Sequence, residues 1–192
     1  MVPGKGRVNP GRTCDSCQKY SSIYLFLSPF SYDHESIRSL IHTLKYQRVR
    51  TLAKVFGQLL ADYSLMFKVV FPEELLVIPL PLHNRRKRIR GFNQSELISK
   101  EFIIQAGSPR GFSIDTDTLL RVKNTKPQVE LSGEERRQNM ADAFAVSQPD
   151  LVKNKTVLLM DDVKTTGATL EEAARALKEA GAKKVWAITV AH

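Results

Sequence analysis

Residues 157–169, VLLMDDVKTTGAT, are the most informative segment of this chain. Its apolar first residues belong to a predicted buried strand over 156–160, and the acids Asp161 and Asp162 follow directly at the end of that strand. A turn that contains Gly167 then leads into a predicted helix over 169–180, which ends at Gly181. A buried strand, a polar turn and a helix in this order are typical of a parallel α/β sheet, in which ligands bind at the carboxyl ends of the strands.

The turn after the two acids has the chemistry of a phosphate site. The free N–H groups at the start of a helix favour an anion, Gly167 lets the backbone approach it closely, and the neighbouring threonines add hydroxyl donors. Two carboxylates beside a phosphate repel it unless they accept hydrogen bonds from hydroxyls or hold a cation, and a ribose 5-phosphate satisfies the whole arrangement. The alternative is an ordinary helix start, because Thr169 and Glu172 match the capping-box pattern.

Apolar periodicity on the N-terminal side of this segment predicts several more elements. A spacing of three and four residues predicts helices from residue 35 and over 52–63, and Asn93 with Glu96 predicts the start of a helix that runs towards Gly107. Short apolar runs predict further strands over 75–81, 118–122, 143–147 and 184–190. We therefore predict an α/β fold, a parallel sheet flanked by helices, over residues 32–192, preceded by a separate N-terminal segment over residues 1–31.

Composition limits the class of protein. The 192 residues are 42% hydrophobic and 26% charged, which argues against a disordered or fibrous chain. No apolar run is long enough for membrane insertion, the basic N-terminus lacks the apolar stretch of a secretory signal, and two cysteines do not make a disulfide framework. These features predict a cytoplasmic protein.

The net charge of +9 lies entirely in the N-terminal half of the chain. Residues 1–100 hold 16 Lys and Arg against seven Asp and Glu, whereas residues 101–192 hold 13 of each. The densest run is NRRKRIR, residues 84–90, in which five of the seven residues are cations. Three interpretations of this run remain open: it neutralises a phosphorylated ligand, it binds a nucleic-acid backbone, or it is a solvated helix face.

The 157–169 segment resembles the phosphoribosyl pyrophosphate (PRPP) motif of type I phosphoribosyltransferases. That resemblance implies that Asp161 and Asp162 bind the ribose hydroxyls and that the following loop binds the 5′-phosphate. It also implies magnesium bound together with PRPP, and displacement of pyrophosphate by a nitrogen nucleophile. By position in the motif, the loop residues are Val163, Lys164, Thr165, Thr166, Gly167, Ala168 and Thr169.

Three further regions resemble the ComF group of proteins, which includes GntX-like members. They are PLHNRRKRIRGFNQSELI (81–98), LKYQRVRTLAKVFG (44–57) and the spaced residues Thr125, Gln128, Leu131, Arg136, Asn139, Ala143 and Phe144. In type I phosphoribosyltransferases the loop after the first sheet strand contacts pyrophosphate. By this resemblance we expect Leu82, His83, Arg86 and Arg90 to take that role.

The ComF resemblance also implies partners. It suggests a link to DNA uptake in natural transformation, contact with single-stranded DNA and with a competence helicase, and a homo-oligomer as one assembly. A non-catalytic protein that handles single-stranded DNA or senses PRPP is the alternative to a phosphoribosyltransferase.

Two segments are given a role by the resemblance alone. Residues 123–140 correspond to the mobile loop that closes over PRPP, with Lys126, Arg136 and Arg137 as its cations, against the alternative of an ordinary surface loop. Cys14 and Cys17 correspond to one of the two cysteine pairs of a zinc ribbon, so we expect a short zinc-ribbon-like remnant here. Free thiols are the alternative, because a complete zinc site needs further ligands, such as His34 or another chain.

Overall fold

A computed structural model describes residues 21–106, 111–123 and 140–192 of the chain. Its helices are α2 (Glu35–Tyr46), α3 (Leu52–Met66), α4 (Asn84–Arg90), α5 (Gln94–Gln105), α7 (Pro149–Val152) and α8 (Ala168–Glu179). Its strands are β1 (Ile23–Leu27), β2 (Leu75–Pro79), β3 (Phe112–Ile114), β4 (Leu119–Arg121), β5 (Phe144–Val146), β6 (Thr156–Val163) and β7 (Lys184–Ala191). In the described part of the chain, no helix has the length and apolar character that crossing a bilayer requires.

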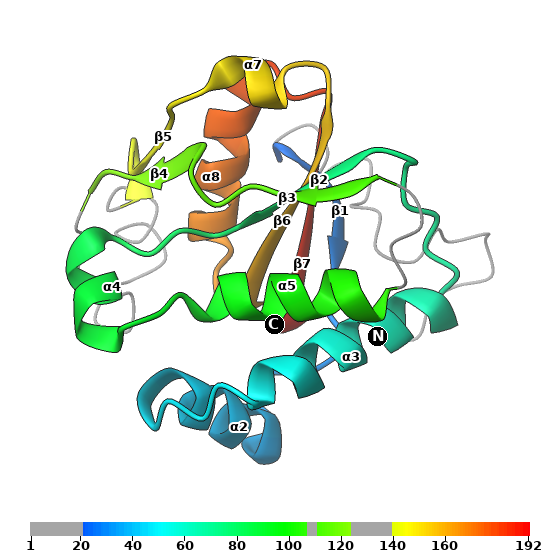
Figure 1. Cartoon of the computed structure of the whole chain (residues 1–192), viewed down its shortest axis with the longest axis vertical. Helices are drawn as coiled ribbons and strands as arrows, with labels where there is room; N and C mark the ends of the chain where they lie inside the picture. Colours follow the sequence, from blue (N-terminus) through cyan, green and yellow to red (C-terminus); the bar gives the residue numbers. More distant parts are fainter. Residues whose placement is uncertain (1–20, 107–110, 124–139) are drawn as a thin grey trace.

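Five strands form one sheet in the order β1-β7-β6-β2-β3, and every neighbouring pair is parallel (Figure 1). The predicted α/β fold, a type I phosphoribosyltransferase-like parallel sheet with flanking helices, is confirmed. Strands β4 and β5 pair antiparallel in a separate two-stranded sheet.

The two faces of the main sheet are buried under different helices. On one face, Leu158 and Met160 of β6 pack with residues of α3 and α5, such as Phe56 and Phe102. On the other face, Leu159 of β6 packs with the apolar stripe of α8. Because β6 is buried from both sides, its sequence shows a continuous apolar run rather than an alternating pattern. This strand lies in the middle of the sheet and carries the two acids at its carboxyl end.

Helices α3 and α5 approach each other closely at Gly57. A Cβ atom at this position would lie 2.5 Å from the Cβ of Glu101 and 2.7 Å from the backbone nitrogen of Phe102. Glycine therefore sets the spacing between the two helices. The spacing matters for function, because the first residues of α5 reach the end of β6.

Several predicted boundaries shift in the structure. The strand predicted over 156–160 continues to Val163, so both acids lie within β6 rather than after it. Helix α8 begins after Gly167, which adopts the left-handed conformation with φ of 82°, and the Thr166 hydroxyl accepts from the backbone N–H of Ala168 at 3.5 Å. Thr169 and Glu172, which match a capping box in sequence, do not form one, because α8 starts at Ala168 and Glu172 accepts from the backbone N–H of Asp142 at 2.7 Å.

The edge strand β1 comes from a segment that showed no helical pattern. Residues 23–27 lie before the predicted boundary at 31/32, yet they pair with β7 in the main sheet. The division into an N-terminal segment and a phosphoribosyltransferase-like domain stays a prediction, because residues 1–20 lie outside the described ones.

Candidate functional site

The carboxyl end of β6 presents two adjacent acids that differ in their surroundings. Asp161 accepts a hydrogen bond from the Ser95 hydroxyl at 2.8 Å and another from the backbone N–H of Asp162 at 2.9 Å, both at its Oδ1 atom. Asp162 is buried, and its Oδ2 atom lies 2.9 Å from the Nζ atom of Lys45 on α2. The acid pair is thus held from both sides, by the first turn of α5 and by the last turn of α2.

The charges at this acid pair shift the pKa values of the groups that form it. Burial, together with the neighbouring charge of Asp162, raises the pKa of Asp161 to about 7, although Lys45 and the Ser95 hydroxyl act in the opposite direction. Burial also lowers the pKa of Lys45, but the charges of Asp162 and Asp161 outweigh that effect, so its pKa lies above the ordinary value. Lys45 therefore stays protonated at neutral pH and supplies a cation within the acid pair.

Helix α5 reaches the acids because its start is fixed by Asn93. The Asn93 side chain accepts from the backbone N–H of Ser95 at 3.1 Å, which confirms the predicted helix cap. Its amide group also donates to the backbone carbonyl of Leu80 at 3.0 Å. Asn93 is buried and so joins the segment after β2 to the start of α5. Glu96, the other residue of the predicted capping box, instead pairs with Lys100.

The segment between β6 and α8 is a short loop that leads directly into the start of a helix. Gly167 is in the left-handed region, where a side chain would be strained, and it turns the chain into the N-terminus of α8. The backbone N–H of Lys164 donates to the carbonyl of Ala191 at 2.9 Å, which fixes the loop to the end of β7. The loop thus starts at the acid pair and ends at a helix N-terminus.

Three arginines also line the site. Arg86 and Arg90 come from α4, and Arg121 comes from β4. Burial and the nearby charge of Arg86 lower the pKa of Arg121 to about 10, so it is still charged at neutral pH. The guanidinium of Arg90 lies over the ring of Tyr46, 5.4 Å from its centroid, and also donates to the side chain of Gln94. Three arginines therefore surround a space that two carboxylates border.

A pocket of about 280 Å³ brings these groups together. Its lining includes most of the residues that the sequence singles out for the site: Asp161, Asp162, Val163, Thr165, Thr169, Leu82, Arg86 and Arg90. Pro81, which the resemblance also places near the pyrophosphate loop, lines it too, as do residues that sequence analysis did not assign: Tyr32, Lys45, Tyr46, Leu80, Gln94 and Arg121.

Five of the residues expected at the site do not line this pocket. Lys164, Thr166, Gly167 and Ala168 belong to the loop between the acids and α8, and Lys164 Nζ lies over the ring of Phe26. His83 caps α4, where its Nδ1 atom accepts from the backbone N–H of Arg85 at 3.3 Å. Their roles in binding stay predictions.

Two predictions concern residues that the structure does not describe. The loop over 123–140 falls almost entirely on residues 124–139, including Lys126, Arg136 and Arg137, which lie outside the described residues. Cys14 and Cys17 also lie outside them, so zinc at this pair stays a prediction. Among the residues that the structure describes, no group of three or more His, Cys, Asp or Glu side chains is arranged to hold a metal ion.

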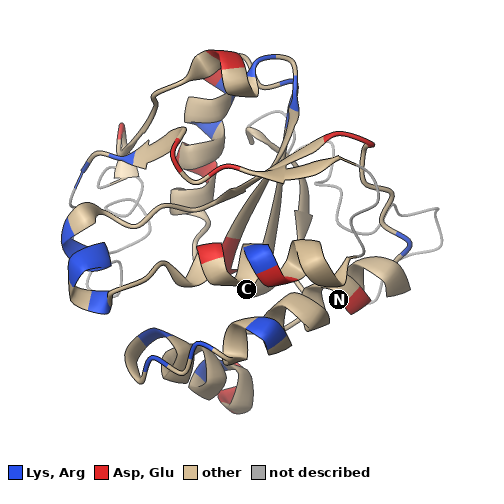
Figure 2. Cartoon of the chain, in the orientation of Figure 1, with Lys and Arg blue, Asp and Glu red and all other residues tan. Residues whose placement is uncertain are grey.

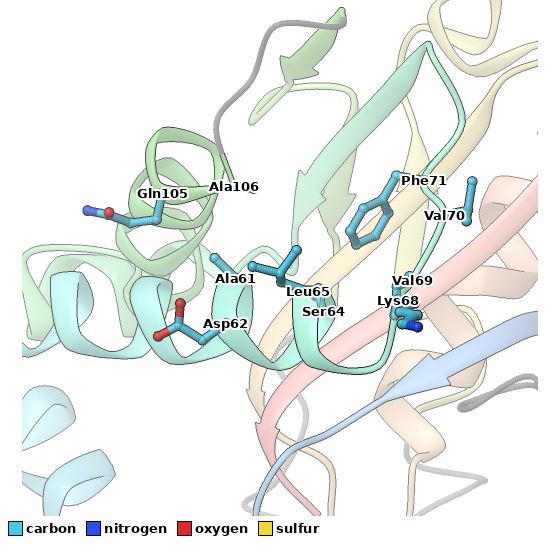
Figure 3. A pocket seen from close by; sticks show the side chains of 10 residues that line it. All are labelled: Ala61, Asp62, Ser64, Leu65, Lys68, Val69, Val70, Phe71, Gln105 and Ala106. Carbon is cyan, nitrogen blue, oxygen red and sulfur yellow. The ribbon is translucent and has the colours of Figure 1, made fainter.

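A second pocket, of about 420 Å³, lies at the far ends of α3 and α5 (Figure 3). It is larger than the first, but it contains no acid pair and its walls are mainly apolar, with Leu65, Val70 and Phe71 among them. In Figure 3 the carboxylate of Asp62 and the amide of Gln105 point away from Phe71. Because polar groups converge in the first pocket and not in this one, the first is the candidate functional site.

For one of the pocket residues that sequence analysis did not assign, Lys45, the sequence does contain an indication of a role. Lys45 belongs to the LKYQR segment that carries the ComF resemblance, which marks it as more than a surface lysine. Arg121 has no such signal, because nothing local to β4 indicates that it reaches α4.

Comparisons with known proteins agree with this geometry. Residues 112–192 match the family described as "Phosphoribosyl transferase domain". The chain is 32% identical over 178 residues to "Competence protein F" of Haemophilus influenzae, an alignment that covers 90% of this chain and 75% of that protein. It is 30% identical over 184 residues to "DNA utilization protein YhgH" of Salmonella typhi, with 94% and 78% covered. It is 29% identical over 140 residues to "Competence protein ComFC" of Bacillus subtilis, with 72% and 53% covered.

Proposed function

The chain belongs to the ComF family of phosphoribosyltransferase-like proteins, and from this membership we propose that it binds PRPP with magnesium at the β6–α8 site. The observation that carries the proposal is the acid pair, Asp161 and Asp162, joined by one short loop to the N-terminus of α8 and faced by arginines in one pocket. Carboxylates accept from ribose hydroxyls, and a helix N-terminus accommodates the 5′-phosphate.

The arginines fit the pyrophosphate end of the same ligand. Arg86, Arg90 and Arg121 line the pocket together with the acids, and a planar guanidinium binds phosphate oxygens through two hydrogen bonds. Each part of PRPP would therefore have a suitable partner: the N-terminus of α8 for the 5′-phosphate, the acid pair for the ribose hydroxyls and the arginines for the pyrophosphate.

Magnesium fits this site as an ion bound mainly through the ligand. Mg²⁺ keeps several waters and few protein ligands when phosphates are present, so it does not need a protein cage, and the acid pair is the nearest set of hard oxygen atoms. When bound, it would supply positive charge that stabilises the departing pyrophosphate.

The proposed reaction transfers the phosphoribosyl group to a nitrogen acceptor. A bond forms between the nitrogen lone pair and the anomeric carbon of the ribose, while the bond from that carbon to the pyrophosphate oxygen breaks and pyrophosphate leaves with the electron pair. The residues of this chain position the ribose and neutralise charge, and no side chain acts as a nucleophile.

Calorimetric titration of PRPP with and without magnesium tests the binding proposal. Saturable, magnesium-dependent binding is expected for the natural chain, and its loss is expected for the variant that combines Asp161→Asn with Asp162→Asn. Asp150→Asn is the matched control, because it makes the same chemical change at an exposed residue of α7. Circular dichroism shows that each variant is folded. Unchanged PRPP affinity in the folded double variant would contradict the proposal.

A specific surface favours a second activity, binding of single-stranded DNA in DNA uptake. We define the cationic ridge as Arg48 and Arg50 in the loop between α2 and α3, with Arg85, Lys87 and Arg88 on α4. All five side chains are exposed. The loop and the helix touch, because Arg48 donates to the carbonyl of Ile89 at 3.0 Å.

The segments that form the ridge contain cations and no acids. Figure 2 shows Lys and Arg on α4 and on the loop between α2 and α3, and residues 36–61 and 75–95 contain no Asp or Glu. Tyr46 is exposed beside the ridge, but its ring already contacts the guanidinium of Arg90 and the ring of His42, so the ridge is expected to bind mainly through phosphate contacts. The names of the relatives, "Competence protein F" and "DNA utilization protein YhgH", agree with a DNA-related role. A partner in DNA uptake, such as a helicase, is part of this second proposal.

The salt dependence of the affinity for single-stranded DNA tests whether the ridge binds it. Each phosphate neutralised on a single strand contributes about −0.7 to the slope of log affinity against log salt, so five contacts predict a slope of roughly −3.5. The variant that combines Lys87→Gln with Arg88→Gln is expected to flatten the slope by about 1.4. The matched control, Lys155→Gln, lies at the opposite end of the sheet, before β6, and should leave the slope unchanged. Absence of binding at low salt would contradict the proposal.

A further inference from the structure

Lys45 is a buried cation of the site for which the proposed reaction has no role. It lies in the last turn of α2, outside the parallel sheet that carries the acids. Its ammonium is 2.9 Å from Asp162 Oδ2, and the side chains of Lys45 and Asp162 are 19% and 4% exposed. At this burial, solvent screens the ion pair far less than it screens a pair on the surface.

The two acids are supported by different groups. Asp161 receives the Ser95 hydroxyl and a backbone N–H, both at one oxygen. For Asp162, the ion pair found in the described residues is the one with Lys45. A buried carboxylate without a counterion is strongly unfavourable, and a second carboxylate next to it in sequence makes this worse. Lys45 therefore compensates a charge that the rest of the site does not.

The contact also restricts the geometry of Asp162. An ammonium 2.9 Å from Oδ2 restrains the carboxylate, and among the described residues no ion pair involves the other oxygen, Oδ1. We propose that Lys45 is a positioning residue of the ribose subsite, which acts through Asp162 by holding one of its oxygens and so orienting the other towards a ribose hydroxyl. This inference rests on the proposed binding of PRPP.

A direct role is the competing explanation, because Lys45 also lines the pocket and an ammonium binds phosphate well. The two roles differ in which ligands lose affinity when Lys45 is removed. If Lys45 acts through Asp162, only a ligand with a ribose is affected. If it contacts phosphate oxygens itself, inorganic pyrophosphate is affected as well.

The experiment titrates PRPP and, separately, inorganic pyrophosphate, each with magnesium, into the natural chain and its variants. Lys45→Met, which keeps the length of the side chain and removes its charge, is expected to weaken PRPP binding by at least about tenfold, as for loss of a hydrogen bond to a charged group. The affinity for pyrophosphate is expected to stay the same. Lys54→Met is the matched control, because Lys54 is exposed on α3 and should change neither affinity.

A double-mutant cycle with Asp162→Asn decides whether Lys45 acts through this acid. Once Asp162 is Asn, Lys45→Met is expected to cause no further loss of PRPP affinity. The double variant removes both charges of the Lys45–Asp162 ion pair, so it tests the inference even if Lys45→Met alone does not fold.

The outcomes separate this inference from the proposed function. A natural chain that does not bind PRPP overturns both. If the natural chain binds PRPP and Lys45→Met binds it equally well, the positioning role alone is overturned. A parallel loss of PRPP and pyrophosphate affinity, or a further loss in the Asp162→Asn background, overturns it too and assigns Lys45 to the phosphates.

Discussion

Substitution of Gly57 by alanine is expected to destabilise the protein although alanine is the better helix former. The added Cβ would lie 2.5 Å from the Cβ of Glu101, 2.7 Å from the nitrogen of Phe102 and 2.8 Å from the carbonyl carbon of Glu101. Ordinary van der Waals contact begins at 3.4 Å, and two of these three atoms belong to the backbone of α5. No rotamer change relieves the clash, so the two helices must move apart.

The size of the effect follows from two opposing contributions. Overpacking of a well-packed contact costs about 1–3 kcal/mol, and the rigid backbone of α5 places Gly57→Ala at the upper end. Replacing glycine by alanine in a helix returns about 0.5–1 kcal/mol. The expected net loss is therefore about 2 kcal/mol, which for a chain of this length lowers Tm by roughly 4–8 °C.

Thermal unfolding followed by circular dichroism measures this loss. Lys54→Ala is the matched control, because Lys54 is exposed on the same helix and its substitution should change Tm little. A Tm for Gly57→Ala that equals or exceeds that of the natural chain would refute the reasoning, since it would mean that α3 and α5 separate without cost.

Two further changes test the site. Asn93→Ala removes the cap of α5 and leaves the buried carbonyl of Leu80 without its side-chain donor, so it is expected to lower the free energy of unfolding by about 1–3 kcal/mol in chemical denaturation. A loss below that range would mean that water replaces both contacts. The pKa of Asp161 is raised from 3.8 to about 7 by burial, so between these pH values the folded state binds more protons than the unfolded chain. This group therefore lowers the free energy of unfolding as pH rises through that window, and Asp161→Asn is expected to remove that part of the pH dependence; an unchanged curve would contradict it.

The sequence predicts those features that depend on local spacing. Periodicity locates α2 and α3, and the apolar run before Asp161 locates β6, because both patterns are imposed by burial of a helix face or of a whole strand. The cap at Asn93 is predicted for the same reason, since the side chain and the N–H that it accepts from are two residues apart.

Contacts between distant residues could not be predicted in this way. Lys45 and Asp162 are far apart in the chain, and their pairing depends on how α2 packs near the end of β6. The edge strand β1 is defined by its pairing with β7, not by a pattern of its own. Likewise, Glu172 matches a capping box in sequence, but it accepts from the backbone N–H of Asp142, which only the fold brings close.

Helix α4 connects the two proposed activities physically. Arg86 and Arg90 line the pocket, whereas Arg85, Lys87 and Arg88 of the same seven-residue helix belong to the exposed ridge. A pyrophosphate group in the pocket and a DNA strand on the ridge would thus place two sets of negative charge against one short helix. Their repulsion acts over about 10 Å at moderate ionic strength, so each ligand is expected to weaken the other, by the same factor in both directions. Because salt screens this repulsion, the mutual weakening should fade as salt rises. Competition between ligands at one overlapping set of contacts would not fade in this way, and the salt dependence of the coupling therefore distinguishes adjacent sites from a shared one.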